Sequence, residues 1–228
     1  MLVTGANRGL GRQFVLSLLD RGAGKVYATA RRPDLIDVPG VIPLHLDITD
    51  PASVAAAAAE ASDVKIVINN AGISTGANLV TGDLDTIRRE MDTHFYGTLN
   101  VIRAFAPQLA DGAILNVLSA ISWLAFDGAG AYHAAKAAEW ALTNSVRLEL
   151  ADQRTLVTGL HLGAADTDMM AWYSGDKTAP EVIVAAALDG IETNRPEVLA
   201  DDWSRQVKVW LSEDPSVIYR EAAAALTV

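Results

Sequence analysis

The sequence predicts an α/β fold of the doubly wound class, in which helices flank a parallel sheet. Short apolar runs rich in β-branched residues alternate with longer stretches of helical periodicity, which is the pattern of repeated strand–helix–strand units. A glycine-rich turn at residues 4–11 joins the first apolar run to the first helical stretch. No linker or internal repeat divides the 228 residues, and this length suits one domain, so we predict a single domain over residues 1–228.

Seven apolar runs have the length and composition of strands. The last run is the weakest, and the first begins so close to Met1 that we expect a few native residues to precede it. The predicted strands cover residues 2–4, 25–30, 41–46, 64–69, 113–118, 155–161 and 197–200.

Helix signals lie between these strands. Asp50 followed by Pro51 is typical of an N-cap and a first helical position, and Gly22 and Gly112 stand where helices are expected to end. The predicted helices cover residues 10–21, 51–61, 83–109, 131–152, 180–193 and 202–211.

Composition narrows the possible function classes. A formal net charge of −10 argues against a surface for nucleic acid or for an anionic membrane. The chain has no cysteine, which excludes disulfides, thiolate chemistry and zinc–sulfur sites, and no spacing of His, Asp and Glu suggests another metal site. No apolar stretch is long enough to span a membrane and the first residues lack the pattern of a signal peptide. We therefore predict a cytoplasmic protein that acts on a small molecule.

The glycine-rich turn is the first candidate binding site. Gly5, Gly9 and Gly11 lie between a predicted strand and a predicted helix. A turn without side chains lets backbone amides approach a pyrophosphate at the positive end of the helix dipole. Tight packing would also explain three glycines, and the gaps between them differ from the usual dinucleotide fingerprint. The turn by itself leaves both interpretations open.

The spacing of these glycines resembles that of the short-chain dehydrogenase/reductase family, and the resemblance runs from Met1 to about Thr167. Residues 69–72 (Asn-Asn-Ala-Gly) and the pair Asp47-Ile48, each at the end of a predicted strand, also carry it. The resemblance implies a Rossmann-type domain and an oxidoreductase that uses a nicotinamide dinucleotide. It places the cofactor against Gly5, Asn7, Arg8, Gly9, Leu10, Asp47, Ile48, Asn70, Ala71 and Gly72.

The end of the second predicted strand indicates which nicotinamide cofactor is used. NAD sites generally carry an acid there, which holds the ribose 2′-hydroxyl, but this strand ends in Ala30-Arg31-Arg32. Arg31, with Arg32 beside it and Arg8 in the glycine-rich turn, would instead pair with a 2′-phosphate. We therefore predict NADP(H); the alternative is that these arginines are ordinary solvated surface residues.

Three residues form a candidate catalytic set. Tyr132 and Lys136 lie four residues apart on a predicted helix and so share one face. Ser119 precedes Tyr132 by thirteen residues, at the carboxyl end of the fifth predicted strand, where open α/β sheets form ligand sites. In the family that the chain resembles, serine, tyrosine and lysine at this separation are catalytic. The alternative is a tyrosine, a lysine and a serine with purely structural roles.

The expected chemistry is the interconversion of a carbonyl and an alcohol. An ammonium beside a phenol stabilises the phenolate, so we expect Lys136 to lower the pKa of Tyr132 toward the working pH. Tyr132 would exchange the proton while hydride passes between the nicotinamide and the carbonyl carbon, and Ser119 would hold the substrate oxygen. The resemblance also implies that Tyr132 and Lys136 contact the cofactor, Lys136 at the nicotinamide ribose.

Two further segments match the family with a substitution in each. Residues 163–167 resemble the part that contacts the nicotinamide carboxamide, which implicates Gly163, Ala165 and Thr167, but Leu162 replaces the usual proline before that glycine. His94 occupies the position of an asparagine that completes a proton relay in the family. Its ring, which titrates at about 6.5 in an unperturbed histidine, could pass protons itself or could be a packing residue.

Bulky side chains follow Ser119 and Thr167 in segments that should border the substrate cleft. They predict a bulky or apolar substrate, although packing under a lid or at a subunit contact explains them equally well. The predicted substrate contacts are Ser119, Trp123, Tyr132, Met169 and Trp172. The remaining histidines, which we expect to be structural, are His45, His133 and His161.

Other functions stay open at this point. An enzyme of the same fold could use the tyrosine for epimerisation, dehydration or isomerisation, and the changes at His94 and Leu162 give this alternative some weight. A nucleotide-sensing protein without turnover would not need Ser119, Tyr132 and Lys136 together. A serine hydrolase is disfavoured, because Ser119 lacks the Gly-x-Ser-x-Gly elbow.

The helix at 131–152 bears on assembly. It carries many small residues, and helices of this kind pair subunits in the family that the chain resembles, so we expect a homo-oligomer. The region from about Arg195 departs from the family's usual glycine-rich ending.

Overall fold

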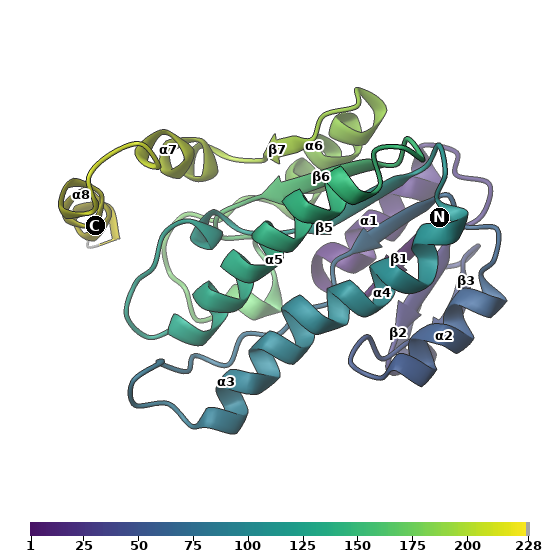
Figure 1. Cartoon of the computed structure of the whole chain (residues 1–228), viewed down its shortest axis with the longest axis horizontal. Helices are drawn as coiled ribbons and strands as arrows, with labels where there is room; N and C mark the ends of the chain where they lie inside the picture. Colours follow the sequence, from purple (N-terminus) through teal and green to yellow (C-terminus); the bar gives the residue numbers. More distant parts are fainter. Residues whose placement is uncertain (227–228) are drawn as a thin grey trace.

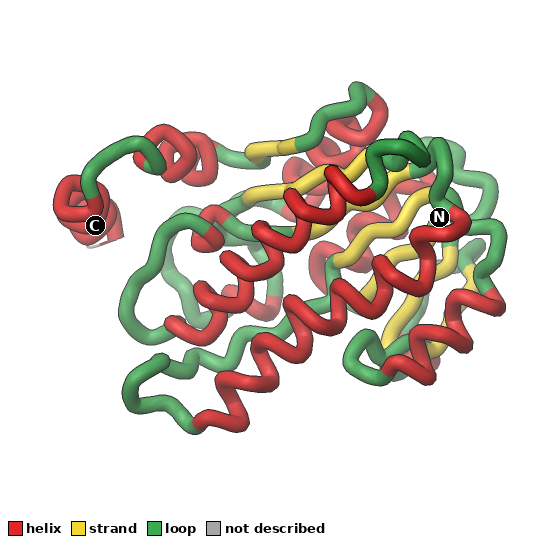
Figure 2. The backbone as a smooth tube through the Cα atoms, in the orientation of Figure 1, coloured by secondary structure: helices red, strands yellow, loops and turns green. Residues whose placement is uncertain are grey.

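A computed structural model describes the backbone of residues 1–226 and the side chains of residues 1–220. Its centre is a seven-stranded, fully parallel sheet with the strand order β3-β2-β1-β4-β5-β6-β7 (Figures 1 and 2). All seven predicted strands are confirmed, and six of them are one or two residues shorter than predicted. The strands are β1 (Leu2–Thr4), β2 (Tyr27–Ala30), β3 (Ile42–His45), β4 (Ile66–Asn69), β5 (Ala113–Val117), β6 (Leu156–His161) and β7 (Glu197–Leu199).

The strand order reverses direction between β1 and β4. From β1 the chain moves outward to β2 and β3, and then returns to β4 and proceeds to the opposite edge. Leu2 pairs with both Tyr27 of β2 and Val67 of β4 at this reversal. In a parallel sheet all carboxyl ends lie at one edge, and ligands bind at the point where the order reverses. The glycine-rich turn follows β1 at this point.

Helices cover both faces of the sheet (Figure 1). On one face, α1 (Gly9–Asp20) packs beside α6 (Pro180–Glu192). On the other face lie α2 (Pro51–Glu60), α4 (Thr98–Phe105) and α5 (Gly130–Glu149). The predicted doubly wound Rossmann fold is therefore confirmed.

The strands divide their side chains between the two helical layers. Leu2 belongs to the core under α2, α4 and α5, whereas its neighbour Val3 belongs to the core under α1 and α6. Val67 and Ile68 of β4 divide in the same way. This alternation follows from the two-residue period of an extended strand, and it explains why the strands read as continuous apolar runs in the sequence.

The predicted helix at 83–109 is not one regular helix. It comprises α3 (Leu84–Met91), a π-helical turn (Asp92–Gly97), α4, and a short 3₁₀ turn (Ala106–Gln108). A π-helical turn inserts an extra residue and rotates the side chains that follow it, and such turns are frequent at functional sites. His94 lies in this turn.

The C-terminal part contains one predicted helix and one that the sequence analysis missed. Beyond β7 the chain forms α7 (Asp202–Trp210), close to its predicted bounds, and then α8 (Pro215–Leu226). In Figure 1 these two helices lie past the β7 edge of the sheet. An Asp201–Ser204 capping box starts α7, and Trp210 packs with Leu124 in a small separate core.

Short 3₁₀ turns complete the described structure: Pro33–Leu35, Ala120–Ser122 and Asp168–Met170. The predicted cap of α2 is confirmed, because the Asp50 carboxylate accepts a hydrogen bond from the Ala52 amide at 2.9 Å. Within the described residues, no helix combines the length and the apolar character that crossing a membrane requires.

Candidate active site

The glycine-rich turn has a backbone that only small residues tolerate. Gly5 and Gly9 have φ angles of +65° and +54°, in the left-handed region that favours glycine. A Cβ atom on Gly11 would collide with the carbonyl oxygen of Gly5. The chain therefore turns tightly into α1 and leaves its amides without side-chain cover, as a pyrophosphate site requires.

The end of β4 holds this turn in place. The Asn70 side-chain amide donates hydrogen bonds to the carbonyl oxygens of Thr4 (3.0 Å) and Gly5 (3.3 Å). In return, the Thr4 hydroxyl accepts hydrogen bonds from the amides of Asn70 and Ala71, both at 2.9 Å. Two predicted cofactor segments are thus joined directly by these contacts.

The other predicted cofactor residues lie along the same edge of the sheet. Asn7, Arg8 and Leu10 follow the turn into α1. Thr167 lies across the turn from Gly9, since a Cβ at Gly9 would be 3.6 Å from the Thr167 Cγ2 atom. The edge also holds Asp47, Ile48, Gly72, Gly163 and Ala165, each just beyond a strand end.

Local contacts position two predicted cofactor residues, Asp47 beyond β3 and Gly163 beyond β6. The Asp47 carboxylate accepts hydrogen bonds from the amide (3.0 Å) and hydroxyl (2.7 Å) of Thr49. Partial burial would raise the pKa of Asp47, but those bonds and the charge of Arg31 lower it. The Gly163 amide donates to Asp201 at 2.6 Å, a contact that orients the backbone where the family's proline is absent.

The arginines at the end of β2 differ in their surroundings. Arg32 forms a two-bonded ion pair with Asp34, at 2.9 and 2.7 Å. Arg31 and Arg8 are exposed, and neither forms an ion pair within the described part of the chain. The structure therefore leaves Arg31 and Arg8 available for an anion, whereas Arg32 would first have to release its partner.

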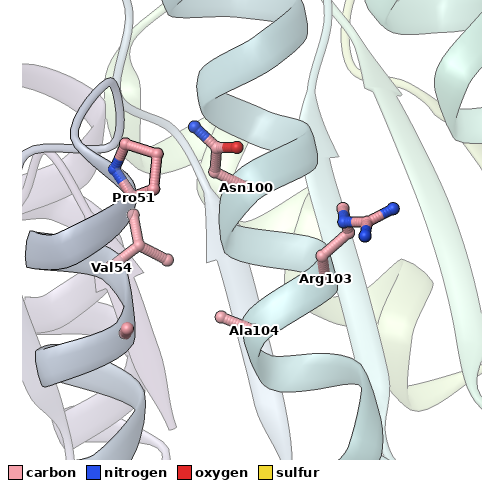
Figure 3. Close-up of a pocket in the computed structure, with 6 residues that line it drawn as sticks. Pro51, Val54, Asn100, Arg103 and Ala104 are labelled. Atoms are coloured by element: carbon pink, nitrogen blue, oxygen red, sulfur yellow. The ribbon is translucent and has the colours of Figure 1, made fainter.

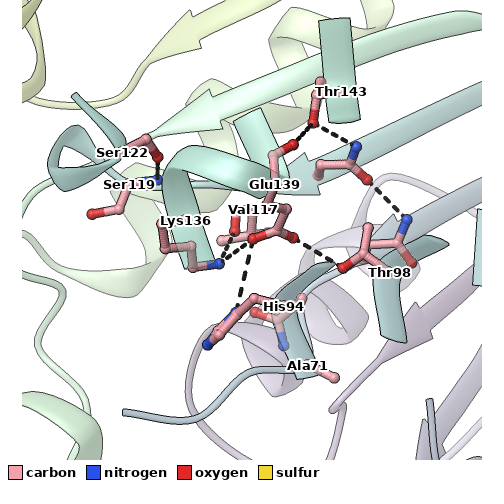
Figure 4. Close-up of polar contacts among 12 residues, drawn as sticks. Ala71, His94, Thr98, Val117, Ser119, Ser122, Lys136, Glu139 and Thr143 are labelled. Carbon is pink, nitrogen blue, oxygen red and sulfur yellow. Dashed lines mark hydrogen bonds and ion pairs between the residues drawn. The ribbon is translucent and has the colours of Figure 1, made fainter. Parts of the chain in front are cut away.

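The predicted catalytic residues meet at the carboxyl ends of β5 and β6. The Ser119 hydroxyl donates to the Leu162 carbonyl at 3.2 Å and accepts from the Ile121 amide at 3.3 Å. On α5, the Lys136 ammonium lies 5.8 Å from the centre of the Tyr132 ring. The ammonium donates to the Val117 carbonyl at 2.7 Å (Figure 4). One strand end and one helix face thus bring the three predicted residues to a single region.

Two buried carboxylates that the sequence analysis missed lie beside this group. Glu139 accepts a hydrogen bond from the Lys136 ammonium at 2.7 Å, and Glu90 lies 3.3 Å from His94 Nε2. Each carboxylate is one helical turn from a predicted site residue, since Glu139 follows Lys136 by three residues and Glu90 precedes His94 by four. Residues three or four apart share a helix face, so this spacing was the sequence signal that could have identified both carboxylates.

Lys136 lowers the pKa of Tyr132 as expected, but the net shift of that pKa is upward. Burial raises the pKa of the Tyr132 phenol, and although Lys136 lowers it, Glu139 and Glu90 raise it further. Burial would lower the pKa of Lys136, but the pairing with Glu139 and the nearness of Tyr132 raise it. The ammonium is charged but already paired, so the net result is a phenol that holds its proton at neutral pH.

His94 lies inside the site rather than at its margin. The ring is 1% exposed, and its Nε2 atom is 2.8 Å from the Ile73 carbonyl oxygen. Its edge meets the Tyr132 ring, with centroids 5.1 Å apart. A Cβ at Gly72 would be 2.7 Å from the His94 Cε1 atom, so the glycine makes room for the ring.

The predicted substrate contacts fall into two groups. Met169 and Trp172 are exposed, in and beyond the 3₁₀ turn that follows Thr167. Trp123 instead stacks on His161, with centroids 3.7 Å apart, and packs toward α7. The contacts of Trp123 therefore fit a packing role rather than a role in contacting substrate.

The three other histidines lie outside the catalytic group. His161 and His133 are buried, and burial lowers the pKa of each to about 4, so both are neutral at neutral pH. His161 lies 3.0 Å from the Ser119 carbonyl oxygen through Nδ1, so it supports the backbone rather than the Ser119 hydroxyl. His45 is exposed and lies next to Ser53.

A separate hollow of about 250 Å³ lies between α2 and α4 (Figure 3). It shares no residue with the predicted site. Its lining residues are Pro51, Val54, Ala55, Asn100, Arg103 and Ala104.

Comparison with known proteins identifies short-chain dehydrogenases and other oxidoreductases as relatives of this chain. Residues 1–177 match the family model described as short chain dehydrogenase. The chain is 34% identical over 189 residues to the NADPH-dependent 1-acyldihydroxyacetone phosphate reductase of Schizosaccharomyces pombe, a match that covers 78% of this chain and 64% of that protein. An uncharacterized oxidoreductase of Mycobacterium tuberculosis is 34% identical over 207 residues, covering 87% of this chain and 82% of the relative.

A solved structure also matches over nearly the whole chain. It is a short chain dehydrogenase from Burkholderia cenocepacia J2315 in complex with NADP, with a TM-score of 0.92 and 36% sequence identity. The match covers 96% of this chain and 95% of that one. With the family model matching most of the sequence, and with the glycine-rich turn and the Ser119, Tyr132 and Lys136 group in place, the chain belongs to the short-chain dehydrogenase/reductase family.

Proposed function

We propose that this chain is an oxidoreductase that transfers a hydride between NADP(H) and a carbonyl or alcohol substrate, and that residues 1–228 act as one cofactor-binding and catalytic domain. One observation carries the proposal: Ser119, Tyr132 and Lys136 lie together at the carboxyl edge of the sheet, beside a glycine-rich turn that is open to a pyrophosphate. A nucleotide-sensing protein would not need this group.

Each catalytic residue has a role that suits its surroundings. Tyr132 supplies the proton to the carbonyl oxygen, because its raised pKa keeps the phenol protonated. Ser119 presents a hydroxyl that now bonds the Leu162 carbonyl and that can turn to hold the substrate oxygen. Lys136 stabilises the phenolate that remains. The bound cofactor supplies the hydride, which goes to the carbonyl carbon.

The residues present fit NADP(H). The backbone of the glycine-rich turn suits a pyrophosphate, and the exposed Arg31 and Arg8 would pair with a 2′-phosphate where an acid would otherwise hold a 2′-hydroxyl. The reductase from Schizosaccharomyces pombe is named as NADPH-dependent, and the structure from Burkholderia cenocepacia contains NADP. These relatives support the same cofactor for this chain.

The identity of the substrate is less defined than that of the cofactor. Met169 and Trp172 expose apolar surface in the segment after Thr167, and this supports a bulky or apolar ketone or aldehyde as substrate. Trp123 is not part of this proposal, because it packs on His161. A homo-oligomer and a cytoplasmic location stay predictions from the sequence.

The test is cofactor turnover. The purified chain should oxidise NADPH in the presence of members of a panel of ketones and aldehydes, followed by nicotinamide absorbance, with one alcohol formed per NADPH consumed. NADH serves as the matched comparison. Product formed without cofactor consumption would instead indicate non-redox chemistry at the same tyrosine.

A further inference from the structure

A buried cluster of charges lies behind the catalytic residues. Its members, called the buried cluster below, are Glu90, His94, Lys136 and Glu139, and none is more than 5% exposed. They come from three elements, since Glu90 lies on α3, His94 in the π-helical turn, and the other two on α5. Ionised groups are rarely buried this deeply without a partner, so the contacts within the cluster decide its charge.

Glu139 is the centre of the buried cluster (Figure 4). One carboxylate oxygen accepts the Lys136 ammonium at 2.7 Å and lies 3.8 Å from His94 Nδ1. The other oxygen accepts the hydroxyl of Thr98 at 3.0 Å. Both oxygens are therefore engaged, and the side chain is fixed between the lysine and the histidine.

Glu90 approaches the same histidine from the other side. One of its oxygens accepts the Thr75 amide at 2.6 Å, and the other lies 3.3 Å from His94 Nε2. Burial would raise the pKa of Glu90, but the nearby His94 ring and the hydrogen bond from the Thr75 amide lower it, so this carboxylate is ionised. His94 Nε2 also lies 2.8 Å from the Ile73 carbonyl oxygen and 3.4 Å from the Ile73 amide nitrogen.

The carboxylates of the buried cluster act against Lys136 at the Tyr132 phenol. Lys136 lowers the pKa of Tyr132, whereas Glu139 and Glu90 both raise it. Ionising the phenol would add a negative charge beside these carboxylates in a low-dielectric region, where like charges repel strongly. The charged and titratable groups that face Tyr132 are Lys136 and Glu139 from its own helix, Glu90 from α3 and His94 from the π-helical turn.

We propose that Glu139 is a positioning residue for the reaction: it anchors the Lys136 ammonium beneath the phenol and, with Glu90, supplies the negative charge that keeps Tyr132 protonated as a proton donor. The inference rests on the proposed role of Tyr132 in carbonyl reduction. In this arrangement Lys136 is held in place without being a free positive charge. The site is thereby set for delivering a proton rather than for accepting one.

The test separates charge from packing at position 139. Glu139→Gln keeps the shape of the side chain and removes its charge, whereas Glu139→Asp keeps the charge and shortens the side chain. Ionisation of Tyr132 is followed by phenolate absorbance as the pH is raised, taking the difference between each protein and the same protein with Tyr132→Phe. Glu149→Gln, on the exposed last residue of α5, is the matched control.

The expected result is a lower ionisation pH for Tyr132 in Glu139→Gln, by about one pH unit or more, since the ammonium then has no carboxylate partner. Glu139→Asp and Glu149→Gln should stay closer to the native midpoint. An unchanged midpoint in Glu139→Gln overturns the proposal. So does a shift in Glu139→Asp as large as that in Glu139→Gln, because loosened packing would affect the shorter side chain at least as much.

Two additions keep the test decisive. If Glu139→Gln does not fold, Glu90→Gln removes the other carboxylate from a different helix and should shift the midpoint in the same direction. If the phenol titration shifts but the alkaline limb of the pH–rate profile for carbonyl reduction does not move with it, the buried cluster is structural only. The phenol titration needs no substrate, so absence of turnover would count against the proposed function and not against the charge arrangement.

Discussion

The ring of His94 meets the ring of Tyr132 edge-on, with centroids 5.1 Å apart and ring planes at 89°. His94 lies in the π-helical turn at Asp92–Gly97, which packs against α5, and its ring lies between the carboxylates of Glu90 and Glu139. Tyr132, the proposed proton donor, therefore has a histidine in edge contact with its ring.

Tyr132→Phe should abolish turnover and leave the affinity for NADPH within a few-fold of native. The phenol is the proton donor in the proposed reaction, and phenylalanine keeps the ring packed against His94. General acid catalysis contributes on the order of 10²–10⁴ in rate, so more than about a tenth of the native rate would contradict the assignment. Steady-state kinetics and titration of cofactor fluorescence measure the two quantities.

Arg31→Asp should reverse a preference for NADPH over NADH. The change removes a charge-assisted contact to the 2′-phosphate and adds a repulsive carboxylate, at a cost of about 2–4 kcal/mol for NADPH. Arg32→Ala is the control, since Arg32 is already paired with Asp34 and its loss should matter less. Ratios of kcat/KM for the two cofactors decide the matter, and a larger effect from Arg32→Ala would move the phosphate contact to that residue.

His94→Asn tests whether the imidazole takes part in proton transfer. If it does, the pH–rate profile of the native protein has an inflection near neutrality that the variant lacks, while the titration of Tyr132 persists. Profiles of identical shape would leave the ring as a packing residue that fills the space beside Gly72. The comparison requires rates from mildly acidic to mildly alkaline pH.

Mild acid should destabilise the fold through its buried histidines. Burial lowers the pKa of His161 and of His133 to about 4, whereas a histidine in the unfolded chain titrates at about 6.5. Between these values the unfolded state binds more protons, so the free energy of unfolding falls as the pH drops from about 6.5 to about 4, by up to about 3 kcal/mol per histidine. Above about pH 6.5 this contribution is fully present.

Urea unfolding at several pH values measures this effect. His161→Gln should flatten the dependence of the free energy of unfolding on pH in that window, because one proton-binding group is removed. His45→Gln, at an exposed position, should leave the slope as it is in the native protein. Equal slopes for His161→Gln and the native protein would show that His161 is not held neutral by the fold.

Assembly should depend on the outer face of α5. Ala134, Ala141 and Leu148 are exposed and spaced seven residues apart, so they form an apolar stripe along the helix, and Leu148 is 79% exposed. Sedimentation at micromolar concentration should show a homo-oligomer for the native chain and a smaller species for Ala141→Arg. A native chain that sediments only as a monomer would refute the prediction.

Much of the fold could be predicted because its signals are local. The strands are recognisable in the sequence as short apolar runs. The cap of α2 depends only on Asp50 and the two residues that follow it. The left-handed backbone conformation at positions 5 and 9 is one that glycine adopts readily. The catalytic spacing is local in the same sense, since Tyr132 and Lys136 share a helix face by their separation alone. These local features carry the resemblance to the short-chain dehydrogenase/reductase family.

The sequence by itself therefore determined the doubly wound sheet, the glycine-rich turn and the identity of the catalytic candidates. Only the tertiary structure decided that Trp123 packs on His161. It also decided that the pKa of Tyr132 is raised and not lowered. The reason is physical: periodicity and backbone conformation depend on neighbours along the chain. The charge beside Tyr132 instead depends on Glu90 and Glu139, which folding brings from separate helices into the same buried, weakly screened space.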